Sequence, residues 1–150
     1  MPQIGQDFEF DDDGDLVVDD TGDIALATPQ RTVIQDIEFR LRTGHWEYEP
    51  DPLIGANLCS LMGWPNRRQT GDAAKDLAYR SLIKDARFEV GSLFVDVVPF
   101  SLNGIIVFAI VQDYIDQVDV GLDGKQLPTI VGFNIGLGDG QISLITDVKV

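Results

Sequence analysis

An Asn-Gly pair between two apolar, β-branched runs is the feature of this sequence that most constrains the fold. Asn103-Gly104 separates residues 93–99 from residues 105–111. Asparagine and glycine adopt the positive φ angles of a tight turn, so the pattern predicts an antiparallel β-hairpin. Two helical patterns precede this hairpin, and helices followed by strands are typical of α+β domains rather than of doubly wound parallel sheets. We therefore expect an α+β fold, with helices packed on a small, mainly antiparallel sheet and with terminal β-hairpin extensions.

Both helices are predicted from apolar residues that repeat at helical spacing. These residues are Val33, Ile34, Ile37 and Leu41 in the first helix, and Ala74, Leu77, Ala78 and Leu82 in the second. Thr28 followed by Pro29 is typical of a helix N-cap with proline at the first helical position. Gly44 is expected to end the first helix, and the second helix is expected to begin after Thr70.

Differences in composition and hydrophobic pattern divide the chain into three regions. Residues 1–28 predict an N-terminal β-hairpin region with acidic turns, residues 29–114 predict the folded core, and residues 115–150 predict a C-terminal β extension or arm. No internal repeat is apparent. The hairpin expected within residues 129–150 has two possible positions: it can cover its own sheet or pair with a neighbouring chain. We favour the neighbouring chain, because the core pattern looks complete by Tyr114.

Composition limits the classes of partner. The chain has 150 residues and a net charge of −14 from 11 basic and 25 acidic residues, which opposes nonspecific binding to DNA and to anionic membranes. No apolar run approaches the length of about 18 residues that a membrane-spanning helix needs. The N-terminus lacks the basic and apolar pattern of a secretory signal, so an intracellular product is expected. Cys59 is the single cysteine and is expected to be a buried packing residue.

Patterns that would support catalysis or metal binding are weak. The acidic run Asp11–Asp15 invites a calcium-loop interpretation, but counting from Asp11 puts Leu16 where an EF-hand needs glycine. Glu47, Glu49 and Asp51 are clustered carboxylates, yet glycoside hydrolysis also needs one carboxyl of raised pKa at a defined distance from a second. Glycine-rich phosphate loops are not apparent. We expect no catalytic, cofactor-binding or metal-binding residues, and we expect the chain not to be an enzyme.

The segment after the first predicted helix carries the most specific pattern. Its markers occur in the order Gly44, Trp46, Pro50 or Pro52, and Gly55. The second helix, the turn Asp85-Ala86-Arg87-Phe88 and the hairpin from Phe94 to Ile110 follow, while residues 23–28 lead into the first helix. In this order the chain resembles the baseplate wedge family of contractile phage tails, whose members also occur in type VI secretion baseplates. The resemblance covers residues 7–112.

The chain departs from the family pattern in the same segment. His45 stands where the family has its characteristic glutamate, and Trp46 stands where many members have arginine. The family uses that charged pair to dock onto the core helices of the wedge, so the docking contact here differs in detail. The spacing to Gly55 is also longer, because both Pro50 and Pro52 are present. The C-terminal hairpin has no clear counterpart in the family.

The resemblance implies a structural protein of the inner baseplate, present in six copies per ring, on which the first ring of sheath subunits assembles by strand addition. Its implied partners are other wedge proteins and the tail sheath protein, with tail tube or hub proteins as further candidates. The implied location is the virion, with assembly in the host cytoplasm. We expect partner contacts at nine residues: His45, Trp46, Pro50, Pro52, Gly55, Phe133, Ile135, Ile142 and Leu144.

Three other interpretations remain open at this point. A type VI secretion baseplate subunit would share the same core. A cell-wall lytic enzyme resembling lysozyme would use the carboxylates near Glu47, since some family members have been described as having lysozyme activity. A small calcium-binding adaptor would use the acidic turns.

Overall fold

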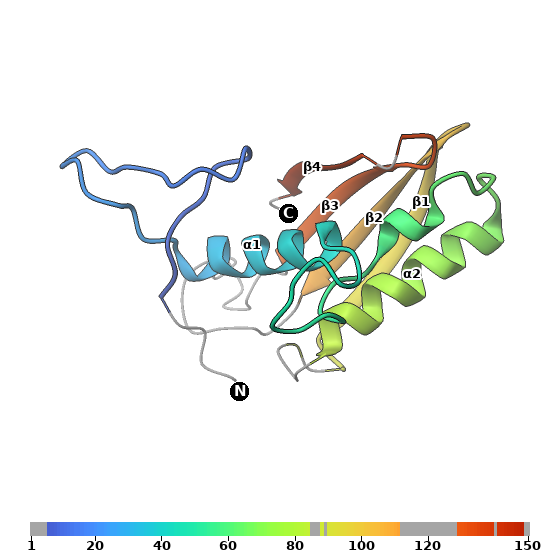
Figure 1. Cartoon of the computed structure of the whole chain (residues 1–150), viewed down its shortest axis with the longest axis horizontal. Coiled ribbons are helices and arrows are strands. Elements are labelled where there is room, and N and C mark those ends of the chain that lie inside the picture. Colours follow the sequence, from blue (N-terminus) through green and yellow to red (C-terminus); the bar gives the residue numbers. More distant parts are fainter. Residues whose placement is uncertain (1–5, 85–87, 89, 112–128, 140, 149–150) are drawn as a thin grey trace, which may run out of the picture.

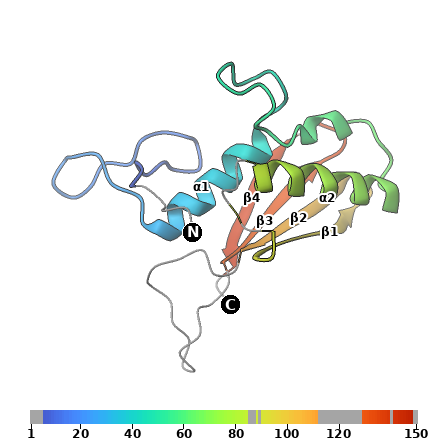
Figure 2. The same ribbon diagram turned by 90° about the horizontal axis from the view of Figure 1, so that it is seen from below.

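A computed structural model describes residues 6–84, 88, 90–111, 129–139 and 141–148, with side-chain burial left out for 129 and 144–148. The elements, in order, are α1 (Pro29–Arg42), the short 3-10 helix η1 (Leu58–Leu61), α2 (Arg68–Ile83), β1 (Leu93–Ser101), β2 (Gly104–Val111), β3 (Thr129–Gly136) and β4 (Ile142–Val148). Both α-helices lie on one face of a four-stranded antiparallel sheet (Figures 1 and 2). The predicted α+β fold class is confirmed.

The helix ends follow from local hydrogen bonds. The Thr28 side chain accepts a hydrogen bond from the Arg31 amide at 3.2 Å, so Thr28 caps α1 as predicted. At the other end, the chain becomes extended at Thr43, one residue before the predicted stop. α2 begins at Arg68, three residues earlier than predicted. Thr70 lies inside its first turn, where its hydroxyl donates to the Pro65 carbonyl at 2.6 Å.

The sheet has the strand order β1-β2-β3-β4, with each strand antiparallel to the next. The predicted hairpin between β1 and β2 is present, but residues 102–103 form its turn, one residue earlier than the predicted Asn103-Gly104. Gly104 is the first residue of β2, opposite Ser101, and neither Asn103 nor Gly104 has a positive φ angle. The register brings Val97 opposite Val107 and Val107 opposite Phe133. These side chains face the helices, because alternate residues of a strand point to opposite faces of the sheet.

The core lies between the two helices and this inner face of the sheet. Ile37 and Leu41 of α1 are fully buried, as are Ala74 and Ala78 of α2. The alanine side chains are small, which lets the backbone of α2 pack closely over β1. Each buried isoleucine or leucine contributes roughly 1.5–3 kcal/mol relative to its exposed state. Burial of this apolar layer is the main stabilising term of the fold.

The C-terminal strands belong to this core, which corrects the expectation that they pair with a neighbouring chain. β3 pairs with β2 along its whole length, and Phe133 and Ile135 are 0% and 1% exposed. The predicted boundary at residue 114 therefore separates strands of a single sheet. The physical reason is that β2 lies inside the sheet, where both of its backbone edges need a partner strand. Residues 115–128, and Tyr114 before them, lie outside the described part of the chain.

The N-terminal region contains a short internal repeat, which corrects the expectation that the chain has none. Residues 7–14 read Asp-Phe-Glu-Phe-Asp-Asp-Asp-Gly, residues 15–22 read Asp-Leu-Val-Val-Asp-Asp-Thr-Gly, and a third unit begins at Asp23. Gly14 and Gly22 end the first two units with φ angles of 88° and 86°, in the region that favours glycine. The repeated residues therefore build the same turn twice.

The three units close on one another through their central residues. The Val17 amide donates to the Glu9 carbonyl at 2.9 Å, the Ala25 amide donates to the Val17 carbonyl at 2.9 Å, and the Glu9 amide donates to the Ala25 carbonyl at 3.0 Å. We call residues 7–27 the N-terminal triangle. It extends beyond the N-terminal end of α1 (Figure 1). Its six large apolar side chains are all exposed: Phe8, Phe10, Leu16, Val18, Ile24 and Leu26.

The corrected assignment of β3 predicts unequal effects of two phenylalanine substitutions. Phe133→Ala removes a fully buried ring and should lower the free energy of unfolding by about 3–5 kcal/mol. Phe94→Ala, at a side chain that is 52% exposed, is the matched control and should cost less than about 1 kcal/mol. Urea denaturation of the purified variants measures both values. Equal losses would contradict the placement of β3 in the core.

Candidate protein-docking site

The loop between α1 and η1, residues 43–57, contains the predicted docking motif and is closed at its base by backbone contacts. The Asn57 amide donates to the Thr43 carbonyl at 3.1 Å, and the Ala56 amide donates to the Arg40 carbonyl at 2.8 Å. Gly55 lies against Thr43 so closely that a Cβ there would overlap the Thr43 carbonyl group, only 2.6 Å from its carbon. Glycine at this position is a condition for closing the loop.

Side chains then fix the loop to the helices. A carboxylate oxygen of Glu47 accepts the Gly44 amide at 2.7 Å, and the Ser81 hydroxyl of α2 donates to the Ile54 carbonyl at 2.7 Å. Both carboxylate oxygens of Asp51 accept from the Lys84 amine, at 2.6 and 2.7 Å. The hydrogen bond from Lys84 lowers the pKa of Asp51 below its usual value. The loop is therefore an ordered platform attached to the end of α2.

Trp46 is the most prominent residue of this platform. Its side chain is 75% exposed, and its φ angle is 70°, which is uncommon for a large side chain. Its backbone amide donates to the Pro52 carbonyl at 2.8 Å, which helps to hold this conformation. Tyr48 and Leu53, in the same loop, are also exposed. This exposure excludes a core role for Trp46 and leaves the interface role predicted from the sequence.

The nine predicted partner-binding residues do not form one surface. His45, Trp46 and Pro50 are exposed in the loop, whereas Gly55 is buried and shapes it. Phe133 and Ile135 are core residues of the same chain, so their predicted partner role is wrong. Of the remaining three, Pro52 is half-buried in the loop, and Ile142 on β4 packs partly against the core. The side chain of Leu144, also on β4, lies outside the described set.

The clustered carboxylates lack the features of a hydrolase site. Glu47 and Asp51 bond to groups of their own chain, and the pKa of Asp51 is lowered, whereas a general acid needs a raised pKa. Burial raises the pKa of Glu38, but this carboxylate pairs with Arg42 at 2.8 Å. Among the described residues, no three histidine, cysteine or acidic side chains are grouped so as to hold a metal ion. The absence of enzymatic activity stays a prediction.

Cys59 is exposed, which corrects the expectation of a buried thiol. Residues three apart share a face of a 3-10 helix, and η1 buries Leu58 and Leu61. Cys59 therefore lies on the outward side. In the described part of the chain, no helix is both long and apolar enough to cross a membrane.

The free edge of β1 is a second candidate surface, which the sequence analysis did not identify. Within the described residues, β1 pairs with β2 only. The Val97 amide donates to the Asp96 carboxylate at 2.9 Å, and we infer that it faces away from β2. Because successive backbone groups alternate in direction, Val95 and Pro99 share the outward direction of Val97. Pro99 lacks an amide hydrogen, and its presence in the strand was a signal for an edge position.

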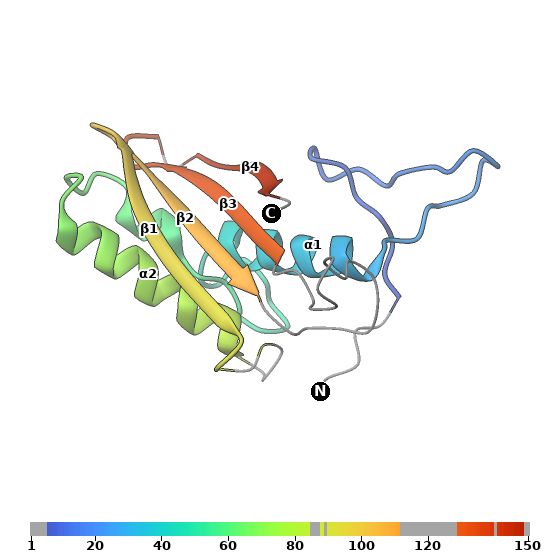
Figure 3. The same cartoon turned by 180° about the vertical axis from the view of Figure 1, so that it is seen from behind.

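Exposed apolar side chains lie beside this edge, on the face of the sheet opposite the helices. Phe94, Val98 and Phe100 are 52%, 43% and 67% exposed. Figure 3 shows that no described helix covers this face. The sequence signal was present, since residues 93–100 are apolar at almost every position rather than alternating with polar residues. Apolar groups beside an open strand edge are typical of a surface that pairs with another chain.

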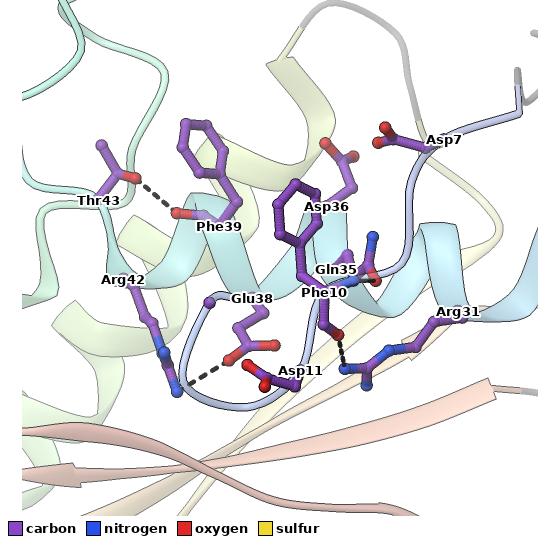
Figure 4. A pocket seen from close by; sticks show the side chains of 11 residues that line it. Asp7, Phe10, Asp11, Arg31, Gln35, Asp36, Glu38, Phe39, Arg42 and Thr43 are labelled. Carbon is purple, nitrogen blue, oxygen red and sulfur yellow. Dashed lines mark hydrogen bonds and ion pairs between the residues drawn. The ribbon is translucent and has the colours of Figure 1, made fainter. Parts of the chain in front are cut away.

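A cavity of about 420 Å³ lies between the N-terminal triangle and α1 (Figure 4). Phe10 and Phe39 line it, and polar side chains of α1 bond to the N-terminal triangle across it. Arg31 donates to the Phe10 carbonyl at 2.6 Å, and Gln35 donates to the Phe8 carbonyl at 3.0 Å. These bonds attach the triangle to the helix. The cavity is therefore best understood as part of that joint.

The closure of the docking loop predicts a strong effect of one added methyl group. Gly55→Ala should lower the free energy of unfolding by about 3 kcal/mol, because its Cβ meets the Thr43 backbone. Gly91→Ala is the matched control, since a Cβ there meets no atom within 4 Å. Thermal and urea unfolding of both variants provide the test. A Gly55→Ala protein as stable as the control would mean that the loop closes differently.

Comparisons with known proteins identify no relative of this chain. No protein-family model matches the chain, and no match is found among curated proteins or among solved structures.

Proposed function

We propose that this chain is a structural component of a contractile phage-tail baseplate, the inner wedge protein on which the sheath starts to assemble. The observation that carries the proposal is the free edge of β1, a strand of nine residues with an outward-facing amide at Val97. An added strand gains affinity from such backbone groups and register from neighbouring side chains. Phe94 and Phe100 are placed to supply that register.

The docking loop is the second part of the proposal. In the family that the sequence resembles, this segment binds the core helices of the wedge. Here Trp46 is exposed on a loop that Gly55 and the Asp51–Lys84 pair hold in place. An aromatic side chain has few rotatable bonds and therefore loses little conformational entropy on binding, which suits it to anchor an interface. The two surfaces would let one chain bind wedge proteins through the loop and sheath protein through the strand edge.

Strand addition at β1 predicts that the Val97 amide is needed for sheath assembly. In phage tails assembled with Val97→Pro, the amide that donates to Asp96 is lost, so sheath should be missing from otherwise complete baseplates. Val97→Ala keeps the amide and is the matched control. Electron microscopy of purified tails counts sheathed particles, and thermal unfolding verifies that both proteins fold. Normal sheaths with Val97→Pro would refute strand addition at this edge.

The docking role predicts that Trp46→Ala prevents incorporation into the baseplate without unfolding the protein. Loss of an aromatic anchor costs about 2 kcal/mol or more of binding free energy, whereas the exposed side chain contributes little to stability. Trp64→Ala removes a tryptophan that is 49% exposed outside the loop and serves as the control. Immunoblots of purified tails measure incorporation. A Trp46→Ala protein that incorporates as well as the control would remove the loop from the proposal.

A further inference from the structure

A groove of about 390 Å³ runs between the first half of α2 and the edge of β1. Its apolar floor consists of Gly71, Val97, Pro99 and Ile105. Basic side chains dominate its polar lining, with Arg67, Arg68 and Lys75 against Asp72 and Asp96. Figures 2 and 3 show α2 running alongside β1, so the groove borders the free strand edge described above.

The basic residues of the groove are weakly engaged. Arg68 approaches Asp72 at 3.9 Å and Lys75 approaches Asp96 at 3.7 Å, and all four side chains are more than half exposed. Within the part of the chain that the structure describes, Arg67 forms no ion pair. By contrast, Lys84 is bonded to its partner at 2.6 Å. In a chain of net charge −14, the groove is one place where basic side chains outnumber acidic ones, three to two.

We propose that this groove receives an extended protein segment with acidic side chains, which pairs with the free edge of β1. The inference rests on the proposed function and names the chemistry of the strand that β1 accepts. In an added strand, every second side chain points toward the helix side of the sheet. Carboxylates at those positions meet Arg67, Arg68 and Lys75, while residues of the other parity lie beside Phe94 and Val98.

Asp96 has a defined part in this event. Its carboxylate now accepts the outward amide of Val97, which is where the backbone carbonyl of an incoming strand would bind. Strand addition therefore displaces the Asp96 side chain from this amide. Lys75, at 3.7 Å from Asp96, is then placed to share its charge with a carboxylate of the incoming strand. The exchange replaces a local hydrogen bond by a ladder of intermolecular ones.

Two synthetic peptides test the charge preference directly. Both have the length of β1 and alternate threonine with a charged residue, which is glutamate in one peptide and lysine in the other. Fluorescence anisotropy at low salt should show that the full-length protein binds the glutamate peptide about tenfold more tightly than the lysine peptide, with the difference shrinking as salt is added. Amide chemical-shift changes should include Val97 and Gly71.

A charge-reversed protein provides the second arm. The triple variant Arg67→Glu, Arg68→Glu, Lys75→Glu should reverse the preference, whereas Arg80→Glu, on an exposed part of α2 outside the groove, should leave it unchanged. Equal affinity for both peptides, no binding of the glutamate peptide, or an unchanged preference in the triple variant would each overturn the inference. If Val97→Pro tails still lack sheath in that case, strand addition stands and only the acidic partner is refuted.

Discussion

Burial of apolar side chains between two helices and the inner face of an antiparallel sheet is the interaction on which the rest of this structure depends. Ile37 and Leu41 of α1 and the alanines of α2 meet Val107 and Phe133 of the two inner strands in one continuous layer. Because β2 is paired on both sides, its backbone groups are satisfied within the chain. That rigid layer positions both candidate surfaces, the docking loop at the ends of the helices and the free edge of β1.

The two faces of the sheet have opposite characters. One face is filled by helices, while the other carries Phe94, Val98 and Phe100 in exposed positions. Soluble monomers usually protect an edge strand with charge, a bulge or proline, and β1 has modest forms of all three. Asp96 occupies one outward amide, a bulge lies near the end of the strand, and Pro99 removes another amide hydrogen. These features limit unselective pairing without closing the edge.

The docking loop illustrates how local strain and tertiary support combine. Trp46 has a backbone conformation that costs free energy for a large side chain, and it persists because the loop is held at its base and by the Asp51–Lys84 pair. The side chain gains little burial in return within the described chain, since it is 75% exposed. Such an arrangement is consistent with a residue whose favourable contacts are made with a partner. Two of the clustered acidic residues, Glu47 and Asp51, bond to groups of their own chain and so help to hold the loop.

Local chemistry in the sequence determined the helix that starts after Thr28 and the hairpin between β1 and β2, because each depends on neighbouring residues. The order of these elements along the chain then indicated the α+β class. The eight-residue repeat of the N-terminal triangle is also present in the sequence. It was missed because its period is short and its apolar residues vary from unit to unit. Whether β3 pairs within its own chain or with a neighbouring chain was decided by tertiary structure alone. Its alternating apolar pattern is the same whether the partner strand belongs to this chain or another, and only the completed layer over Phe133 selects its own sheet. The exposure of Trp46 was decided in the same way, because burial is a property of the packed chain and no residue type fixes it.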